Sequence, residues 1–361
     1  MNFENVIQRK NKWLLPFSWL YKTGVVIFHK LYDWGIKKTV EPQLPVICIG
    51  NLSVGGTGKT PMVEYLLRLL LPQFKVATIS RGYKRQSKGI IIADSKTIVS
   101  DIGDEPMQFH TKFPKAIVVV GEKRVQAMNE LMIDYPATQV VILDDAFQHR
   151  AIKAGLNILL TDYHNLYNND YYLPAGQLRD LKSNAAKADI IIVTKCPDNL
   201  SIEERTTIAE TITRTSSQQV YFTSIRYGKL YNIFTNECVN LYDIHKVLLL
   251  TGIANPLPLE KYVKQQGTDS ELFNFPDHHT FTLRDMGKIK QQFELIPTQN
   301  KAILTTEKDA TRLMAFRSEL SALPVVAITI EHQFLFNEGE KFDKAVIEFI
   351  NAKTIQNEEE K

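Results

Sequence analysis

The chain has 361 residues, of which 44% are hydrophobic and 23% are charged, and its formal net charge is +3. This length indicates two domains, and the composition is typical of globular proteins, which excludes wholesale disorder and a multi-span membrane protein. The near balance of 43 basic and 40 acidic residues gives no overall argument for nucleic-acid binding. The three cysteines are widely separated without zinc or redox spacing, which favours a reducing compartment.

The N-terminal segment, residues 13–36, is rich in aromatic and aliphatic side chains but is interrupted by Lys22, Lys30 and Asp33. Because a bilayer span takes about 20 nearly uninterrupted apolar residues, this segment does not cross a membrane. It also lacks the small-residue cleavage site of a signal peptide. Aromatic residues with flanking basic residues are typical of a helix in a membrane interface, which we predict within residues 1–40. The alternative is a helix packed on its own domain.

Six apolar runs of strand length alternate with helical patterns in the region 41–225. The runs are residues 44–49, 75–79, 116–120, 139–143, 156–160 and 189–193. Runs that are apolar on both faces and separated by helices indicate a parallel sheet with helices on both sides. Polar side chains follow almost every run, and open α/β sheets bind ligands at the carboxyl ends of their strands. We therefore predict an α/β domain with its active site at this edge.

A second α/β pattern begins near Tyr242. Its predicted elements are a strand at 246–251, a helix at 283–293 and a strand at 302–306. Residues 221–240 are strand-like without a strong helical pattern, so we predict that they connect the two domains. We place the linker and second, smaller domain at 226–361, with residues 354–361 frayed because they are polar and acidic.

The most informative motif is residues 50–60, Gly-Asn-Leu-Ser-Val-Gly-Gly-Thr-Gly-Lys-Thr, which follows the first apolar run and opens an amphipathic helix through Leu71. Glycines let backbone amides approach phosphate oxygens, Lys59 reaches the β- and γ-phosphates, and Thr60 ligates Mg²⁺. Ser53 stands where the general pattern has glycine. A glycine-rich turn without a ligand is the alternative, but the flanking strand and helix favour a loop that binds a nucleoside triphosphate with Mg²⁺.

Two neighbouring carboxylates, Asp144 and Asp145, follow the apolar run at 139–143. Enzymes with such a phosphate-binding loop keep a magnesium-holding carboxylate at the end of a buried strand. The alternative is that these acids cap the next helix. Given the phosphate-binding loop, we favour a metal site.

Asp104 and Glu105 precede a predicted helix, in the motif Asp-Ile-Gly-Asp-Glu-Pro at residues 101–106. A phosphoryl acceptor hydroxyl needs a carboxylate or histidine to receive its proton, and either residue is a candidate. Acids at the start of a helix are also ordinary partners of the helix dipole.

Two further groups of side chains are weaker candidates. Asp277, His278 and His279 follow one another in a loop, where zinc binding and a solvated loop are the alternatives. Basic residues near the predicted strand ends suit a phosphorylated substrate, although each is individually explained as a surface charge. These residues are Arg81, Arg85, Lys123, Arg124 and Arg179.

Together these motifs resemble the tetraacyldisaccharide 4′-kinase family, the lipid A 4′-kinases of Gram-negative bacteria. The likeness extends from the N-terminal helix past Thr306-Glu307-Lys308-Asp309. The matching motifs are Gly50-Asn51, Gly55-Gly56-Thr57-Gly58-Lys59-Thr60-Pro61, Ser80-Arg81-Gly82-Tyr83, Gly103-Asp104-Glu105-Pro106, Leu143-Asp144-Asp145, Phe147-Gln148-His149 and Asp277-His278-His279. Enzymes of this family phosphorylate the 4′ hydroxyl of an acylated glucosamine disaccharide 1-phosphate, using ATP and Mg²⁺.

The resemblance implies two α/β/α domains joined by a strand linker, and it implies roles for single residues. The nucleotide-binding residues are Ser53, Val54, Gly55, Gly56, Thr57, Gly58, Lys59 and Thr60. The metal-binding residues are Thr60, Asp144 and Asp145. The catalytic residues are Lys59, Asp104 as the base, and His278 as its support. The positions associated with the substrate or with organisation of the site are Tyr83, Glu105, Arg124, Arg179 and Asp180.

Three residues depart from the family pattern. Lys84 and Ala146 stand where glycine is common, and Asp180 is shorter than the usual glutamate. None of the three removes a group that phosphoryl transfer needs, so they bear on loop conformation and on reach.

The expected protein is a peripheral kinase of lipid A biosynthesis at the cytoplasmic face of the inner membrane. It acts on an acylated disaccharide 1-phosphate, contacts the membrane through its N-terminal helix and binds no nucleic acid. Two rivals stay open here. One is an NTPase that drives metal insertion or protein assembly, and the other is a non-enzymatic, membrane-associated nucleotide-binding scaffold. The scaffold predicts that Asp104→Ala leaves function intact.

Overall fold

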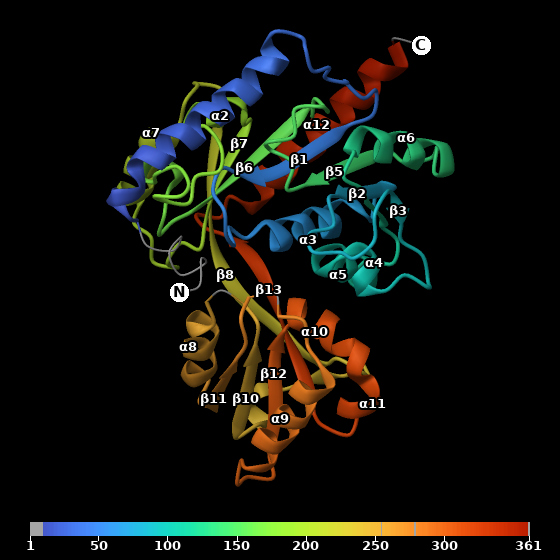
Figure 1. Cartoon of the computed structure of the whole chain (residues 1–361), viewed down its shortest axis with the longest axis vertical. Helices are drawn as coiled ribbons and strands as arrows, with labels where there is room; N and C mark the ends of the chain where they lie inside the picture. The colour runs from blue at the N-terminus through green and yellow to red at the C-terminus, as the bar shows by residue number, and fades with distance from the viewer. Residues whose placement is uncertain (1–9, 254, 278, 360–361) are drawn as a thin grey trace.

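The computed structural model of the chain describes residues 10–253, 255–277 and 279–359. Figure 1 shows two lobes, and the first lobe is built on a sheet of parallel strands. These strands are β1 (Val46–Asn51), β2 (Val76–Ser80), β4 (Ile117–Val120), β5 (Val140–Asp144), β6 (Leu156–Asp162) and β7 (Ile190–Thr194). Their order is β7-β6-β1-β5-β2-β4, and short β3 (Ile91–Ile92) ends this edge as an antiparallel strand. All six predicted runs are confirmed to within two residues.

Helices cover both faces of the first-lobe sheet because successive strand residues point to opposite sides. Ile47 and Ile49 share a core with α3 (Lys59–Leu70), α4 (Val99–Ile102), α5 (Asp104–Lys112) and α12 (Gly339–Glu359). Val46 and Cys48 lie in the opposite core, with α6 (Arg124–Asp134) and α7 (Ile202–Ile212). The predicted α/β/α architecture is confirmed for this lobe.

The second lobe is a smaller α/β/α unit, as predicted. Its sheet contains the parallel strands β10 (Lys246–Thr251), β11 (Asp269–Asn274) and β12 (Lys301–Thr306). The next strand in this sheet is β13 (Val325–Phe334), which pairs with β12 in parallel. On one face lies α8 (Leu257–Gln265). On the other lie α9 (Leu283–Glu294), α10 (Glu307–Leu313) and α11 (Arg317–Leu320).

Two long antiparallel strands pass between the lobes (Figure 1). The first, β8 (Gln219–Asn232), pairs with β7 at its start and with β13 along its length, and it confirms the predicted strand linker. Short β9 (Cys238–Val239) pairs with β8. The second crossing strand is β13, which brings the chain back to the first lobe. The sheet is therefore continuous through both lobes.

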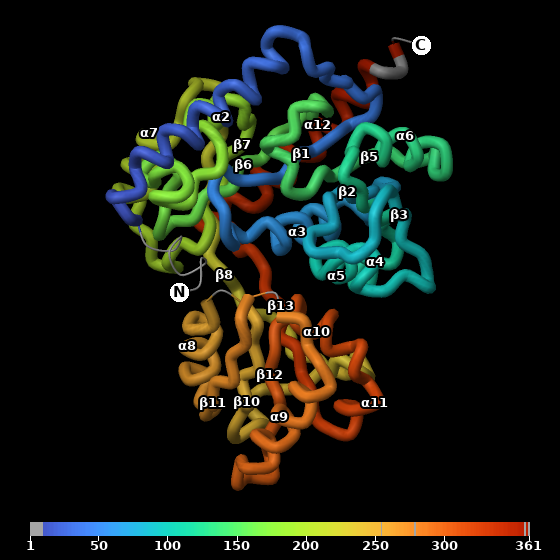
Figure 2. The backbone as a smooth tube through the Cα atoms, viewed as in Figure 1, coloured from blue at the N-terminus to red at the C-terminus, as the bar shows by residue number. Residues whose placement is uncertain are grey.

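The C-terminal helix belongs to the core of the first lobe. Phe342, Val346 and Ile350 of α12 are buried in the same cluster as Ile47, and Figure 2 shows the red end of the chain beside the first-lobe strands. The domain boundaries given above stay a prediction. The expected fraying from residue 354 is wrong up to Glu359, because α12 continues to that residue.

The N-terminal helix buries two polar residues and exposes many of its large apolar residues. It is α2 (Leu15–Asp33), after a short 3₁₀ turn η1 (Lys12–Leu14), and its two buried residues are Ser18 and His29. Large exposed side chains of this segment are Trp13, Phe17, Trp19, Leu20, Ile27, Trp34 and Ile36. The helix thus makes its most buried contacts with its own lobe through polar groups and leaves an apolar surface uncovered. Within the described residues, no helix is long and apolar enough to cross a membrane.

Candidate active site

The loop between β1 and α3 has the backbone of a phosphate-binding loop. Gly55 and Gly58 adopt φ values of +101° and +83°, which L-residues rarely adopt, and α3 begins at Lys59 directly after Gly58. The first N–H groups of a helix have no partner within the helix, so they are available to an anion. Ser53 is buried, pairs with Leu178 in a β-bridge and has no positive φ. The backbone at Ser53 therefore does not need glycine.

Side chains from distant strands hold this loop in place. Thr194, at the end of β7, donates its Oγ1 hydrogen to the carbonyl of Thr57 at 3.0 Å. Nε2 of His332, from β13, lies 2.8 Å from the carbonyl of Gly58. Burial lowers the pKa of His332 to about 4, so the ring is neutral and donates this bond. A Cβ at Gly58 would lie 2.9 Å from Cε1 of His332, so only glycine leaves room for this contact.

The acidic pair at the end of β5 faces the loop. Nζ of Lys59 lies 3.6 Å from Oδ1 of Asp145, and Nη1 of Arg179 donates to Oδ2 of Asp145 at 3.1 Å. Nη2 of Arg179 contacts the other oxygen of Asp145 and donates to Oδ1 of Asn51 at 2.6 Å. Burial opposes ionisation of Asp145, but the charges of Lys59 and Arg179 outweigh it and hold its pKa well below the usual range. Arg179 therefore joins this carboxylate to the phosphate-binding loop.

Asp144 differs from its neighbour because no cation among the described residues contacts its carboxylate. Burial and the charge of Asp145 raise its pKa to about 7, and no hydrogen bond or ion pair to its carboxylate occurs within the described residues. No helix follows Asp145 directly, since the chain turns and continues into β6, so the helix-cap alternative is wrong. A divalent cation would balance the negative charge of this buried carboxylate. Mg²⁺ is usually bound by one or two carboxylates and by few other protein groups. The residues fit the predicted metal.

A protein-only metal cage is absent from the residues that the structure describes, where no group of three or more His, Cys, Asp or Glu is placed to hold an ion. Mg²⁺ characteristically keeps several waters and substrate phosphate oxygens in its shell. Asp144, Asp145 and the hydroxyl of Thr60, the residue after Lys59, are thus sufficient as the protein's share.

Arg124 stabilises the turn that carries the acidic pair. It is the first residue of α6, it is buried, and its Nη2 donates to the backbone carbonyls of Asp144 at 3.3 Å and Asp145 at 3.0 Å. Burial lowers its pKa, opposed by the charges of both aspartates. In the structure, Arg124 organises the site from behind the carboxylates.

The start of α5 supplies a second pair of carboxylates. Oδ2 of Asp104 accepts hydrogen bonds from Nε of Arg312 at 2.9 Å and from Nη2 of Arg312 at 2.7 Å. Oε1 of Glu105 lies 2.9 Å from Nζ of Lys308. Burial is the main cause of the lowered pKa of Lys59, and the charge of Glu105 is among those that oppose it. The start of α5 therefore lies near the phosphate-binding loop.

The loop after β2 lies beside the start of α5. Tyr83 is 61% exposed, and its carbonyl oxygen would lie 2.8 Å from a Cβ at Gly103, the residue before Asp104. Lys84 has a φ of +58°, which accounts for the glycine that is common there in the resembling family. Keeping an L-residue in this conformation costs about 1–2 kcal/mol.

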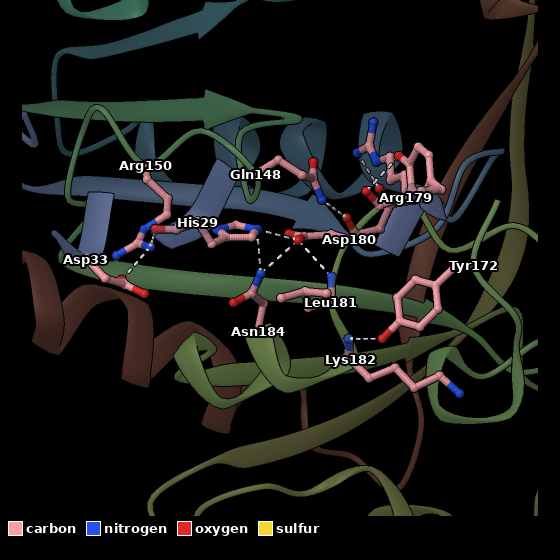
Figure 3. A network of polar contacts seen from close by, with 12 residues as sticks. His29, Asp33, Gln148, Arg150, Tyr172, Arg179, Asp180, Leu181, Lys182 and Asn184 are labelled. Atoms are coloured by element: carbon pink, nitrogen blue, oxygen red, sulfur yellow. Dashed lines mark hydrogen bonds and ion pairs between the residues drawn. The ribbon is translucent and has the colours of Figure 1, made fainter. Parts of the chain in front are cut away.

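Asp180 lies under α2 and next to Arg179. It is fully buried, and its Oδ1 accepts from Nε2 of His29 at 2.7 Å, from Nδ2 of Asn184 at 2.7 Å and from the backbone N–H of Leu181 at 2.8 Å. Figure 3 shows these groups converging on the carboxylate beside Arg179. Asp180 thus anchors the N-terminal helix, a function that we did not predict.

A cavity of about 600 Å³ lies between α2 and the site. Its lining residues are Phe17, Leu20, Tyr21, Gly24, Val25, Phe28, His29, Gln148, Pro174, Arg179 and Asp180. The side of the cavity formed by α2 is mainly apolar. On the opposite side, the Arg179 guanidinium binds Asp145, and the Arg179 carbonyl accepts a hydrogen bond from the Tyr21 hydroxyl at 3.0 Å. The cavity connects the exposed N-terminal helix with the acidic pair.

Two other expectations have different outcomes. His278 lies outside the described residues, so its role stays a prediction. Its neighbour His279 stacks on Phe275, with ring centroids 4.6 Å apart, and its Nε2 lies 3.0 Å from Oδ2 of Asp285, which indicates a packed loop. Nη2 of Arg85 lies 2.7 Å from Oε1 of Glu122, and this ion pair stabilises the loop after β2 that carries Arg85.

The structure also identifies residues that the sequence analysis missed. His332 and Arg312 have no local motif, and they come from β13 and from α10. Arg312 follows the matched segment that ends at Asp309, which was the one signal in the sequence.

Comparisons with known proteins agree with this geometry. The family model described as "Tetraacyldisaccharide-1-P 4'-kinase" matches residues 10–351. Relatives named "Tetraacyldisaccharide 4'-kinase" include one from Phocaeicola vulgatus, 44% identical, covering 94% of this chain and 95% of the relative. Another, from Flavobacterium johnsoniae, is 42% identical and covers 94% of this chain and 97% of the relative.

Among solved structures, LpxK from Aquifex aeolicus in complex with ATP matches with a TM-score of 0.72 and 30% sequence identity. The match covers 93% of this chain and 98% of that one. The resemblance predicted from the motifs is confirmed, and the chain belongs to the tetraacyldisaccharide-1-P 4′-kinase family.

Proposed function

We propose that this chain is an ATP-dependent kinase that transfers the γ-phosphate to the 4′ hydroxyl of a tetraacyl glucosamine disaccharide 1-phosphate in lipid A biosynthesis. The observation that carries the proposal is the placement of the α5 carboxylates near the phosphate-binding loop and near Asp144, whose carboxylate has no cation partner within the described residues. The relatives named for this activity, and the related structure solved with ATP, support it.

The phosphate-binding loop and the acidic pair form the nucleotide half of the site. Backbone N–H groups of residues 55–60 and the start of α3 bind the phosphate oxygens, and Lys59 places its charge beside the β- and γ-phosphates. Thr60, Asp144 and Asp145 would hold Mg²⁺, which would supply positive charge to offset the negative charge that develops during transfer. Arg179 keeps Asp145 oriented toward this half of the site.

Asp104 is the base in the proposed reaction. Its carboxylate takes the proton from the 4′ hydroxyl while that oxygen forms a bond to the γ-phosphorus, and the bond from the γ-phosphorus to the bridging oxygen breaks to release ADP. Lys59 stabilises the charge on the transferred group. His278 supports Asp104 in this proposal, and His278→Ala is expected to lower turnover more than ATP affinity.

The apolar surface of α2 is proposed to lie in the cytoplasmic leaflet of the inner membrane, with the protein bound peripherally. Its exposed aromatic residues and neighbouring lysines suit the interface of an anionic membrane. The acyl chains of the substrate then stay near α2, and the 600 Å³ cavity offers the sugar a route toward Arg179. This arrangement accounts for a helix that buries Ser18 and His29 instead of its aromatic residues.

Phosphate transfer tests the kinase directly. Purified protein is incubated with ATP labelled at the γ-phosphate and with tetraacyl disaccharide 1-phosphate in detergent, and the lipid product is separated from phosphate. Transfer of label to the lipid supports the proposal. Release of free phosphate without labelled lipid supports the NTPase rival, and ATP binding without either product supports the scaffold.

The membrane contact has a built-in reporter. The three tryptophans of the chain are Trp13, Trp19 and Trp34, which are 91%, 70% and 66% exposed. We expect a blue shift of tryptophan emission and quenching by brominated lipids when anionic vesicles are added. Phe17→Ser weakens this binding, whereas Ile202→Ser, at a 70% exposed position on α7, does not. Emission that is unchanged by vesicles would exclude the proposed contact.

A further inference from the structure

Arg312 connects the second lobe to the proposed base. It lies in α10, and it reaches across the lobes to Asp104 at the start of α5, where both of its hydrogen bonds go to Oδ2, at 2.9 and 2.7 Å. The two side chains are 8% and 13% exposed. The hydrogen bond to Asp104 is the main interaction that raises the pKa of Arg312 against the effect of burial, so the guanidinium stays charged.

The guanidinium is itself held in one orientation. Nη1 donates to Oδ1 of Asp309 at 2.9 Å, and Asp309 is fully buried. Oδ2 of Asp309 accepts from the backbone N–H of Gly252 at 3.0 Å and from Oγ1 of Thr306 at 2.9 Å. These two partners stand after β10 and at the end of β12, so a continuous set of hydrogen bonds runs from the second-lobe sheet to Asp104.

Stability alone does not account for this arrangement. Taking two charges out of water costs about as much as their attraction returns, so a buried ion pair is weak evidence of stabilisation. Two other ion pairs already join α5 to α10, Lys308 with Glu105 at 2.9 Å and Lys112 with Glu307 at 2.7 Å. What Arg312 adds is direction, because a planar guanidinium with donors fixed at both ends holds a carboxylate in one rotamer.

We propose that Arg312 is a positioning residue that holds the Asp104 carboxylate in the orientation needed to take the proton from the acceptor hydroxyl. The inference rests on the proposed function. Arg312 acts through Asp104, and the second lobe thereby sets the geometry of a base that belongs to the first. A base displaced by about 1 Å loses on the order of 100-fold in rate, and ground-state binding of ATP does not depend on it.

The test compares three variants of the full-length protein in the lipid phosphorylation assay. Arg312→Gln is expected to lower kcat about 100-fold with the KM for ATP unchanged. Arg312→Lys keeps the charge without the fork, so we expect it to restore part of kcat. Arg317→Gln, at an exposed arginine on neighbouring α11, is the matched control and keeps the wild-type kcat. Thermal unfolding of each variant reports on the fold.

Each outcome supports or overturns the inference. A low kcat for Arg312→Gln with unchanged ATP KM, and partial recovery in Arg312→Lys, supports positioning. A kcat close to wild type in Arg312→Gln overturns it. If Arg312→Gln does not fold, Arg312→Lys decides alone: a reduced kcat at an unchanged melting temperature supports the inference, and a wild-type kcat overturns it. Absence of lipid phosphorylation by the wild type overturns the proposed function, and this inference with it.

Discussion

The two halves of the site balance their charges in different ways. On the nucleotide side, residues 53–60 with Asp144 and Asp145, one carboxylate has no protein cation within the described residues and its pKa rises to about 7. On the α5 side, Asp104 and Glu105 are each paired with a cation of α10. The nucleotide side is thus completed by its ligand, whereas the α5 side is completed by the second lobe.

Both sides depend on supports that lie far along the chain. His332 contacts the loop of the nucleotide side from a position 274 residues after Gly58, and Arg312 contacts Asp104 from a position 208 residues away. The two sides differ in what they serve, which is the phosphates on the nucleotide side and the proposed base on the α5 side. Changes on the nucleotide side should therefore alter ATP affinity, and changes on the α5 side should alter turnover without altering it.

The largest expected effect tests the α5 side at the base itself. Asp104→Asn keeps an oxygen that can accept from Arg312 but cannot take a proton at neutral pH, so kcat should fall about 10²- to 10⁴-fold. ATP affinity, measured by titration calorimetry, should stay at the wild-type value. Turnover within tenfold of wild type would remove Asp104 from the chemistry and end the distinction between the two sides.

A slightly smaller effect is expected at Lys59 on the nucleotide side. Lys59→Ala removes a charge placed for the phosphates, which should cost about 10²- to 10³-fold in kcat and also weaken ATP binding. Arg179 still holds Asp145 in this variant, so the fold should persist. The comparison with Asp104→Asn is the control, and unchanged ATP affinity in Lys59→Ala would contradict the proposed division.

A variant of Asp180 tests whether this residue, which lies beside the nucleotide side, has a structural role. Asp180→Ala leaves His29 and Asn184 without their shared acceptor, and we expect the free energy of unfolding to fall by about 2–4 kcal/mol. Urea denaturation measures this change, with Asp198→Ala, at an exposed position, as the control. Unchanged stability together with a higher KM for the lipid would instead make Asp180 a substrate contact, as the family resemblance implies.

The smallest effect concerns the α5–α10 contact and its pH dependence. Burial and the charge of Glu64 raise the pKa of Glu307 from 4.5 to about 7. The folded protein therefore binds this proton more tightly than the unfolded chain, so the stabilisation is complete below about pH 4.5 and is lost as pH rises through 7. From this group we expect a loss of about 1–3 kcal/mol in the free energy of unfolding between pH 5 and pH 8.

Glu307→Gln separates this contribution from those of other groups. The glutamine can still accept from Lys112 but does not titrate, so its unfolding free energy should fall less than that of the wild type over the same pH range. Urea denaturation of both proteins at the two pH values measures the difference. If the unfolding free energies of the two proteins change equally with pH, then Glu64 does not raise the pKa of Glu307 across the lobes.

Much of the fold was predictable because its signals are local. The six strands of the first lobe are mainly apolar, since both faces of a parallel sheet are covered, and each was predicted to within two residues. The phosphate-binding loop was predictable because its positive φ values favour glycine, and glycines at these positions are visible in the sequence. By contrast, β13 and the return of α12 to the first lobe depend on long-range pairing and were not predicted.

Sequence alone determined the chemistry that each segment carries: a loop for phosphate, two acids at the end of β5, two acids at the start of α5 and an aromatic N-terminus. Tertiary structure alone decided what holds these groups. It placed Asp180 under α2, His332 on the carbonyl of Gly58 and Arg312 on Asp104. The physical reason is that a backbone conformation is encoded by the residues that adopt it. The partner of a buried charge is chosen by packing, and that partner can lie anywhere in the chain.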